Sequence, residues 1–393
     1  MKKGWQTKTL GETCEMYQPK TISGKEMVAD GAYPVFGANG VIGRYNQFNH
    51  EEPQLLITCR GATCGSVNIS EPRSWVTGNA MVVRPKNGSI ELGFLEYLFR
   101  GGIDISKAIT GAAQPQITRT NLAPLEISYP ESLAEQQRIV GLLDEAFEGL
   151  ATAKANAEKN LQNARALFES HLQSVFTRPA LSAAEGRGKG WVENNLKSIT
   201  TKIGSGATPR GGGESYKEEG VSLIRSLNVH DLGFKYAKLA FLDDAQADEL
   251  SNVEVQPRDV LLNITGASVA RCAIVPDDVL PARVNQHVSI IRPIAEKLDA
   301  DFLHYLLISK PYKDQLLKTG EEGGSTRQAI TKAQIQEFTV EYPATLKDQK
   351  IIVTKLDAML AETQRLARLS ERKHAALEAL KKSLLHRAFS GKL

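Results

Sequence analysis

The sequence predicts an α+β protein made of two mixed α/β domains separated by an antiparallel coiled coil of two long helices. Three observations support this prediction. Residues 129–176 align with residues 342–389 without a gap, and 14 of these 48 positions are identical. Both segments lack proline after their second residue, whereas the sequence before each is rich in short apolar runs and turns. A duplicated element without slippage indicates two equivalent helices in a pseudo-twofold internal repeat.

The repeat extends beyond the helices, where its offset changes. Gly4-Trp5 matches Gly190-Trp191 at an offset of 186, Arg84-Pro85 matches Arg292-Pro293 at 208, and Ile117-Thr118 matches Ile330-Thr331 at 213. The offset stays at 213 through the helices, so insertions belong to the non-helical part of each copy. This pattern is typical of a fixed scaffold that carries two divergent domains.

The division of the chain follows from these markers. We predict a first mixed domain at 1–130, a long helix at 131–177, a linker at 178–190, a second mixed domain at 191–343 and a second long helix at 344–393. The linker is small, polar and glycine-rich, which is typical of a flexible connection.

Short apolar runs between glycine, proline and asparagine residues predict many short strands in each mixed domain. The clearest runs are residues 54–58, 80–84, 259–264 and 288–291. A short helix is expected at 94–99 in the first domain, and its repeat at 302–308 in the second.

The long helices begin with residues at capping-box spacing, Ser132 with Glu135 and Thr345 with Asp348. Apolar residues then recur near heptad spacing, for example at Ile352, Leu356 and Met359. A helix of about 44 residues is roughly 65 Å long. Because a single amphipathic helix of this length is poorly stable alone, we expect the two helices to pair antiparallel, with one domain at each end.

Composition describes an ordinary globular chain of 393 residues with 41% hydrophobic residues and a net charge of +3. The mild charge neither requires nor excludes an acidic partner. No run of 18 apolar residues and no signal-peptide pattern is present, so a cytoplasmic protein without a membrane partner is expected. The four cysteines are not at zinc spacing with histidine, and reduced thiols are expected.

Catalytic motifs are missing from the sequence. The glycine-rich stretch 204–213 is not followed by the Gly-Lys-Ser/Thr of a nucleotide-binding P-loop, and turns between strands explain it more simply. The chain has no Pro-Pro dipeptide, which excludes the Asp/Asn-Pro-Pro-aromatic motif of amino-methyltransferases, and no His-Glu-x-x-His zinc motif. We therefore expect no catalytic residue, no metal ligand and no cofactor on this chain.

The combined pattern resembles the DNA specificity subunit (S subunit) of type I restriction–modification enzymes. The residues that carry the resemblance lie in both halves and span nearly the whole chain: Tyr33–Gly43, Arg60–Gly65, Glu135–Val140, Ile203–Pro209, Gly220–Arg225 and Asp348–Val353. Two positions depart from the family pattern, Ala207 before Thr208-Pro209 and Lys350 in place of the first copy's Gln137.

The resemblance implies that each mixed domain is a target recognition domain that reads one half of a split, asymmetric sequence in double-stranded DNA. The helices would set the spacing between half-sites. Two copies of a methyltransferase (modification) subunit would dock on the chain, and restriction/translocase subunits would join them. S-adenosylmethionine, ATP and Mg²⁺ would then belong to partner subunits.

Candidate DNA-binding residues are polar side chains on the glycine-rich loops, where arginine suits guanine and glutamine suits adenine. In the first domain they are Lys20, Arg44, Tyr45, Arg60, Gln114, Gln116 and Arg119. In the second domain they are Thr208, Arg210, Arg225, Ser226, Arg271, Arg327 and Gln328.

Other interpretations of these residues and of the function of the chain remain open. Each arginine is equally compatible with a solvated or salt-bridged surface side chain, and the basic residues 365–387 with a solvated coiled-coil face. A structural coiled-coil adaptor whose two domains bind protein is the main alternative function. An enzyme that uses the glycine-rich loops to hold a nucleotide is a further one.

Overall fold

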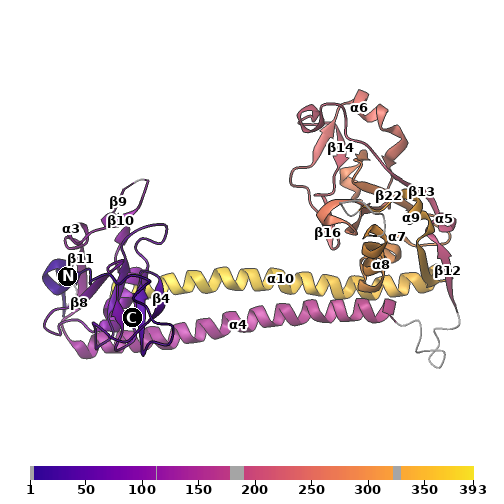
Figure 1. Cartoon of the computed structure of the whole chain (residues 1–393). Coiled ribbons are helices and arrows are strands. Elements are labelled where there is room, and N and C mark those ends of the chain that lie inside the picture. Colours follow the sequence, from indigo (N-terminus) through magenta and orange to yellow (C-terminus); the bar gives the residue numbers. More distant parts are fainter. Residues whose placement is uncertain (1–3, 112, 178–189, 322–328) are drawn as a thin grey trace. The chain divides into compact units, whose positions relative to one another are not determined.

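The computed structural model describes residues 4–111, 113–177, 190–321 and 329–393, which form two compact units (Figure 1). The first unit comprises Met1–Lys159 with Leu369–Leu393, and the second comprises Asn160–Arg368. Each unit therefore contains one mixed domain together with a stretch of both long helices. We call the mixed domains head 1 (residues 4–130) and head 2 (residues 190–343). Residues 178–189 of the linker predicted at 178–190 lie outside the described residues.

Head 1 and the helix that follows it are built from short strands and helices. In chain order they are β1 (Trp5–Thr9), α1 (Leu10–Thr13), β2 (Cys14–Tyr17), β3 (Tyr33–Gly37), β4 (Gly40–Tyr45), β5 (Leu55–Thr58), β6 (Val67–Ile69), β7 (Trp75–Val76), β8 (Ala80–Pro85), α2 (Leu92–Tyr97), β9 (Ile109–Thr110), β10 (Gln116–Ile117), α3 (Arg119–Leu122), β11 (Glu126–Pro130) and α4 (Leu133–Thr177).

Head 2 and the helix that follows it have more elements. They are β12 (Trp191–Asn195), α5 (Leu196–Ile199), β13 (Thr200–Ser205), β14 (Val221–Ile224), β15 (Val229–His230), β16 (Gly233–Phe234), β17 (Ala240–Leu242), α6 (Asp244–Glu249), β18 (Glu254–Val255), β19 (Val260–Asn263), β20 (Cys272–Ile274), β21 (Ala282–Val284), β22 (Val288–Pro293), α7 (Ala300–Ile308), α8 (Lys310–Glu321), α9 (Lys332–Glu337), β23 (Thr339–Pro343) and α10 (Leu346–Phe389).

The two heads share one sheet topology. Each has a four-stranded antiparallel sheet, ordered β2-β8-β5-β6 in head 1 and β13-β22-β19-β20 in head 2. Each has a second sheet in which one pair is parallel, β3 with β7 and β14 with β21. In each head the first strand pairs with the last in the same register, Trp5 opposite Pro130 and Trp191 opposite Pro343. The internal repeat predicted from sequence is therefore a structural repeat.

Insertions in head 2 explain why the sequence offset drifts. The hairpin β15–β16, helix α6 and strand β18 all lie between β14 and β19. Helix α8 lies between α7 and the end of the head, where head 1 has a short turn at residues 105–108. These additions lengthen head 2. Strand β18 also adds a fourth strand to its second sheet, because it pairs with β21.

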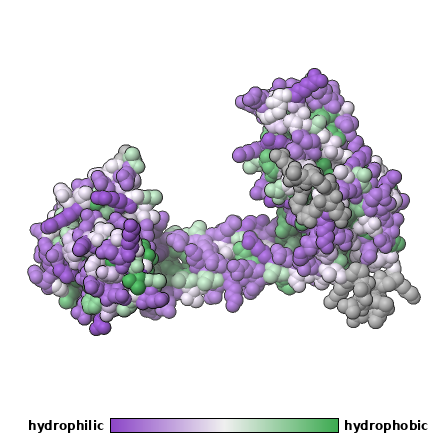
Figure 2. All heavy atoms as spheres, viewed as in Figure 1, coloured by the Kyte–Doolittle hydropathy of each residue, from purple (hydrophilic) through white to green (hydrophobic). Residues whose placement is uncertain are grey.

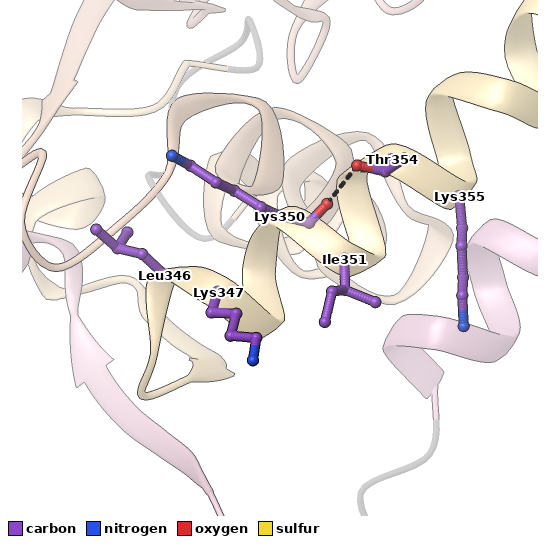
Figure 3. A pocket seen from close by; sticks show the side chains of 6 residues that line it. All are labelled: Leu346, Lys347, Lys350, Ile351, Thr354 and Lys355. Carbon is purple, nitrogen blue, oxygen red and sulfur yellow. Dashed lines mark hydrogen bonds between the residues drawn. The ribbon is translucent and has the colours of Figure 1, made fainter.

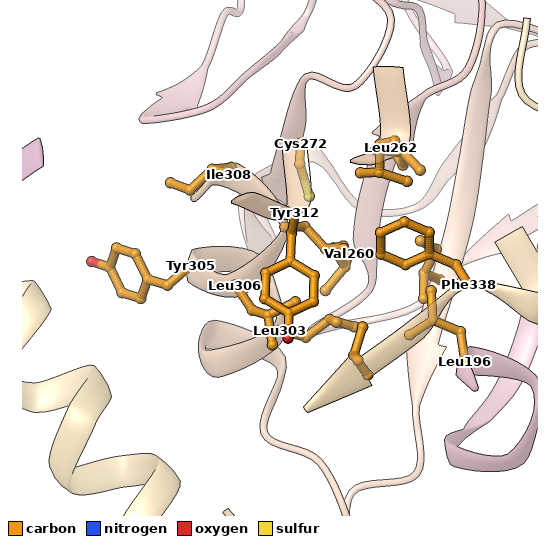
Figure 4. Packing of buried hydrophobic residues seen from close by; sticks show 14 of the residues in the cluster. Leu196, Val260, Leu262, Cys272, Leu303, Tyr305, Leu306, Ile308, Tyr312 and Phe338 are labelled. Atoms are coloured by element: carbon orange, nitrogen blue, oxygen red, sulfur yellow. The ribbon is translucent and has the colours of Figure 1, made fainter. Parts of the chain in front are cut away.

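The main core of head 2 lies between its four-stranded sheet and helices α7 and α8. Val260 and Leu262 on β19 contact Leu303 and Leu306 on α7, and all four side chains are fully buried (Figure 4). The corresponding core of head 1 places Leu55 and Ile57 on β5 against α2, with Phe94 fully buried. Burying each such side chain stabilises the fold by roughly 1.5–3 kcal/mol.

The long helices pair antiparallel within each unit, which Figure 1 shows for α4 and α10. In the first unit the Lys381 ammonium lies 5.2 Å from the Phe147 ring centroid, and His374 Nε2 lies 3.2 Å from Glu158 Oε1. In the second unit the Thr363 hydroxyl donates to the Ala164 carbonyl at 3.4 Å. The predicted fold class is thereby confirmed: two mixed α/β domains, a pseudo-twofold repeat and a pair of long antiparallel helices.

One buried glutamine joins each head to its helix. The side-chain oxygen of Gln136 accepts from the Glu91 N–H at 2.8 Å, and its amide nitrogen donates to the Pro130 carbonyl at 2.8 Å. Gln349 makes the same pair of bonds, to the Asp299 N–H at 2.7 Å and the Pro343 carbonyl at 2.8 Å. Both glutamines are fully buried. The identity of these residues in the repeat therefore reflects a joint between head and helix.

A tyrosine–aspartate bond repeats further along each helix. The Tyr97 hydroxyl donates to Asp144 at 2.5 Å, and the Tyr305 hydroxyl donates to Asp357 at 2.6 Å. Burial and the neighbouring carboxylate raise the pKa of both tyrosines, so both hydroxyls stay protonated donors at neutral pH. Each head is held to its helix by the same two contacts.

Hydrophilic residues cover most of the surface seen in Figure 2. Among the described residues, no helix is both long and apolar enough to cross a membrane.

Candidate nucleic-acid interface

A glycine-containing loop follows the central strand of each head and opens the candidate interface. We call residues 60–65, after β5, and residues 265–270, after β19, the glycine loops. Gly61 has a φ of +87° and Gly266 a φ of +75°, a left-handed conformation that glycine adopts without steric cost. The same backbone turn therefore presents Arg60 in head 1 and Thr265 in head 2.

A closing segment near the end of each head pairs with the glycine loop. In head 1 the Ile117 N–H donates to the Cys59 carbonyl at 2.9 Å, and Arg60 lies opposite Gln116. In head 2 the Ile330 N–H donates to the Ile264 carbonyl at 2.8 Å, and Thr265 lies opposite Ala329. Ile117 and Ile330, which the sequence repeat aligns, therefore make equivalent backbone bonds in the two heads.

A turn after β3 in head 1, and after β14 in head 2, meets the same loop. The Thr58 hydroxyl at the end of β5 donates to the Ala38 carbonyl at 2.6 Å. The Asn263 side-chain amide at the end of β19 donates to the Ser226 carbonyl at 2.9 Å. Different side chains thus hold the turn in the same place in both heads.

A fourth segment, residues 77–79 in head 1 and 285–287 in head 2, completes the arrangement. The Cys59 N–H donates to the Asn79 carbonyl at 3.4 Å, and the Ile264 N–H donates to the His287 carbonyl at 3.0 Å. Four segments therefore meet on one backbone frame in each head. We call the surface that they form the loop face.

The loop face of head 1 brings together three of the predicted DNA-binding residues. Arg60, Gln114 and Gln116 are all exposed there, and Arg119 is exposed at the start of α3 directly after the closing segment. Within the described residues, Arg60 has no carboxylate partner. Its guanidinium and the two amides are therefore free to donate to, or accept from, a ligand on this face.

The other head 1 candidates lie elsewhere or at the margin. Arg44 donates to the carbonyls of Gly31 at 2.5 Å and Ala32 at 2.9 Å, so its guanidinium fixes a loop. Tyr45 packs edge-on against Trp75, with 5.3 Å between ring centroids. Both sit at the end of the β3–β4 hairpin opposite the turn, so the structure does not bring them to the loop face. Lys20 is exposed on the loop after β2.

The loop face of head 2 is a shallow hollow. It is lined by Ser226, Leu227, Thr265, Gly266, Ala267, Ser268, Arg271 and His287. Two of the predicted residues, Ser226 and Arg271, are among them. The Thr265 hydroxyl and His287 Nδ1 share a hydrogen bond of 2.5 Å, which ties the glycine loop to the fourth segment by side chains as well as by backbone.

The remaining head 2 candidates divide into exposed and structural residues. Arg225 is half-buried, donates to the Lys238 carbonyl and lies 5.1 Å from the Tyr216 ring centroid, so its guanidinium supports the fold. Arg210 is exposed, and within the described residues it has no carboxylate partner. Thr208 is hydrogen-bonded to Gln286. Arg327 and Gln328 lie outside the described residues.

Sequence reasoning missed the fourth segment. Asn79 and Gln286 are exposed on it, and His287 is half-buried. Neither residues 77–79 nor residues 285–287 match a motif, and their sequences, Thr-Gly-Asn and Asn-Gln-His, differ between the heads. Their position in the repeat could have identified them as equivalent, because residues 77–79 directly precede β8, residues 285–287 directly precede β22, and the repeat aligns these two strands.

The cysteines near the glycine loop of head 1 are neutral thiols. Burial raises the pKa of Cys59 and of Cys64, and the Cys64 thiol donates to the Cys59 carbonyl at 3.5 Å. Protonated thiols are poor nucleophiles and poor metal ligands. Within the described residues, no group of three or more His, Cys, Asp or Glu side chains is arranged to hold a metal ion.

A separate hollow lies on the first turns of α10 and includes no loop-face residue. Lys347 and Lys355 point to the same side of the helix as Ile351, Lys350 points away from it, and Thr354 donates to the Lys350 carbonyl at 2.8 Å (Figure 3). Further along the same helix, Arg365 is paired with Glu362 at 2.7 Å. The three lysines precede the basic stretch 365–387, within which Arg365 pairs with a carboxylate of the same helix.

Comparison with known proteins identifies the class to which this arrangement belongs. The family model for the type I restriction modification DNA specificity domain matches residues 2–161 and again residues 188–372. The chain belongs to this family, and the two matches coincide with the two halves of the repeat. The prediction of a sequence-specific DNA recognition subunit is confirmed at the level of the family.

Two curated relatives carry the same description. The chain is 29% identical over 141 residues to the type I restriction enzyme EcoprrI specificity subunit of Escherichia coli. That match spans 35% of this chain and 34% of the relative. It is 20% identical over 418 residues to the type I restriction enzyme MjaVIII specificity subunit of Methanocaldococcus jannaschii, spanning 99% of this chain and 93% of the relative.

Solved structures share the fold along the whole chain. One, from work on complex assembly and conformational transition of the type I R-M system, has a TM-score of 0.75 at 20% identity and covers 99% of this chain and 98% of its own. The HsdS subunit of Thermoanaerobacter tengcongensis has a TM-score of 0.62 at 20% identity and covers 99% of this chain and 97% of its own. At this identity the likeness concerns the fold alone.

Proposed function

We propose that this chain is the DNA recognition subunit of a type I restriction–modification complex, and that each head reads one half of a bipartite, asymmetric target. The observation that carries the proposal is the loop face. Both heads place four segments on the same backbone frame, yet the side chains on that frame differ, for example Arg60 against Thr265 and Gln116 against Ala329. One frame with two sets of side chains suits two different half-sites.

The loop face also has the right chemistry for the major groove. Exposed arginine and glutamine offer hydrogen-bond donors and acceptors that match guanine and adenine edges, and a good pair discriminates by roughly 1–3 kcal/mol. The loops are held by backbone hydrogen bonds to the central sheet, so their side chains are positioned before DNA binds. Rigid presentation favours sequence readout over nonspecific attraction to phosphates.

The long helices have a different part in the proposal. Their antiparallel pairing and the matching joints at Gln136 and Gln349 support a spacer that fixes the separation of the half-sites. A chain with two equivalent halves also offers two equivalent docking positions, which suits two copies of a methyltransferase subunit. Restriction/translocase subunits would join this core.

Catalysis belongs to the partner subunits in this proposal. The chain itself is a non-catalytic specificity subunit that binds no cofactor, and S-adenosylmethionine, ATP and Mg²⁺ are held by the partners. A DNA substrate also favours the cytoplasmic location predicted from the sequence.

The test is selection from a pool of random double-stranded DNA by the full chain, assembled with its methyltransferase subunits, at several salt concentrations. A bipartite consensus and a steep loss of affinity with rising salt are expected, because phosphate contacts release counterions. Selection of no consensus contradicts the proposal, and binding that is insensitive to salt favours the protein-binding adaptor instead.

An Arg60→Lys variant sharpens the test, because lysine keeps the positive charge and loses the planar fork of donors. We expect preference at one base pair of one half-site to weaken by roughly 5- to 150-fold, with an unchanged salt dependence. Arg73→Lys is the matched control, since Arg73 is exposed in head 1 and lies 3.8 Å from Glu51. An effect of Arg60→Lys on both half-sites contradicts the division of labour between heads.

A further inference from the structure

The loop after β13 is pinned against the fourth segment of head 2. A Cβ atom on Gly206 would lie 1.7 Å from the Val284 carbonyl oxygen, so a side chain at this position would displace the loop. The Gly206 N–H donates to the Asn285 carbonyl at 3.2 Å. Thr208 follows two residues later, and its position is therefore fixed relative to the fourth segment.

Thr208 holds the side chain of Gln286. The Thr208 hydroxyl donates to Gln286 Oε1, and the Gln286 side chain is otherwise exposed. The backbone on both sides of Gln286 is also held, because the Asn285 N–H donates to the Ile224 carbonyl at 3.1 Å and the Ile264 N–H donates to the His287 carbonyl at 3.0 Å. Among the described residues the Gln286 Nε2 has no hydrogen-bond partner, so its N–H₂ group can donate to a ligand.

Head 1 has no side chain at the equivalent position. Gly78 occupies it, and a Cβ there would lie 2.7 Å from both the Pro19 carbonyl oxygen and the Thr21 hydroxyl. The loop after β2 fills the space that the Gln286 side chain uses in head 2. The two heads therefore differ at this position by packing as well as by residue type.

We propose that Gln286 is a specificity-determining residue of head 2, that its amide donates to a hydrogen-bond acceptor on a base edge in the major groove, and that Thr208 is the positioning residue that orients this amide. This inference rests on the proposed function and assigns one base contact within it. An amide N–H₂ donor matches N7 of adenine or guanine, O6 of guanine and O4 of thymine, whereas the N4 amino group of cytosine offers it no acceptor.

The test compares the DNA consensus selected by the full chain, in its methyltransferase complex, with those of Gln286→Glu and Thr208→Val. Glutamate is isosteric with glutamine but only accepts, so Gln286→Glu is expected to shift the preference at one position of one half-site toward cytosine, whose N4 amino group donates, by roughly 5- to 150-fold. Thr208→Val keeps the shape and removes the hydroxyl. It is expected to broaden the base preference at that same position, because the side-chain amide of Gln286 can then rotate and exchange its oxygen and nitrogen.

Gln256→Glu is the matched control. Gln256 is exposed in head 2 before β19, at the end of that strand opposite the glycine loop, so it adds the same charge far from the loop face. A uniform loss of affinity in Gln286→Glu without a change of consensus, or a result equal to that of Gln256→Glu, overturns this inference and leaves the proposed function intact. Absence of any consensus with the unsubstituted chain overturns both.

Discussion

The two heads are alike at their joints with the long helices and different on the loop face. Gln136 and Gln349 are identical, and so are Asp144 and Asp357, and all four join a head to a helix. On the loop face, by contrast, Gly78 stands where head 2 has Gln286. In these examples, identical residues of the repeat join a head to its helix, and residues that differ lie on the loop face.

One pair of identical residues has different surroundings in the two heads. Arg84 and Arg292 occupy equivalent positions on β8 and β22, and each pairs with a carboxylate. Arg84 lies 2.5 Å from Glu15, and both side chains are about half exposed, at 51% and 52%. Arg292 makes two bonds to Asp259, at 2.7 and 2.8 Å, and the Asp259 side chain is fully buried. The same residue in the repeat thus has a surface contact in one head and a buried contact in the other.

The largest expected effect is a difference in the free energy of unfolding between variants of these two arginines. Replacing Arg292 by leucine leaves the Asp259 carboxylate buried without its partner, which should cost about 3–5 kcal/mol of the free energy of unfolding. Replacing Arg84 by leucine should cost at most about 1 kcal/mol, because water solvates the exposed Glu15. Urea unfolding of the full chain and both variants measures the difference. Equal costs would show that burial does not distinguish the two pairs.

The next effect should be equal in the two heads. Replacing Gln136 or Gln349 by leucine leaves a part-buried backbone N–H and a buried carbonyl without this partner, and each unpaired buried group costs about 1–3 kcal/mol. We expect both variants to lower the free energy of unfolding by similar amounts. Gln162→Leu on the exposed face of α4 is the control. A large cost in one head and none in the other would break the equivalence of the joints.

Much of the fold was predictable because periodicity and repetition are visible in a sequence. The strands expected at 54–58, 80–84, 259–264 and 288–291 are β5, β8, β19 and β22, and the helices expected at 94–99 and 302–308 overlap α2 and α7. The ungapped repeat also identified both long helices. The insertions β15–β16, α6 and α8 in head 2 were not predicted, because they have no counterpart in head 1.

The candidate site was harder to predict, because it depends on contacts between segments far apart in the chain. Arg60 and Gln116 are predicted DNA-binding residues because each lies on a loop between predicted elements. The backbone pairing of those two loops brings the residues together. Arg44 and Arg225 are predicted DNA-binding residues on the same grounds, yet their guanidinium groups donate to backbone carbonyls of their own head. Nothing in the residue type distinguishes an arginine that supports a loop from one that faces outward.

The smallest effect concerns a histidine that only head 2 has at its position. His304 on α7 is half-buried and shares a hydrogen bond of 2.8 Å with the Asp231 carbonyl, whereas the equivalent residue on α2 is Glu96, paired with Arg100 at 2.7 Å. Burial lowers the pKa of His304 below its ordinary value of 6.5, and this outweighs the opposing effect of the Asp231 contact.

A lowered pKa in the folded state makes stability depend on pH in one direction. The unfolded chain binds a proton at His304 more readily than the folded chain does, so this contribution is fully present above about pH 6.5 and is lost as the pH falls toward the folded-state pKa. His304→Gln removes the titration and retains a donor for Asp231. The loss of unfolding free energy between about pH 7.5 and pH 5.5 should therefore be smaller in His304→Gln than in the unsubstituted chain. An unchanged loss would mean that His304 takes up its proton without cost to the fold, and that this difference between the heads has no consequence for stability.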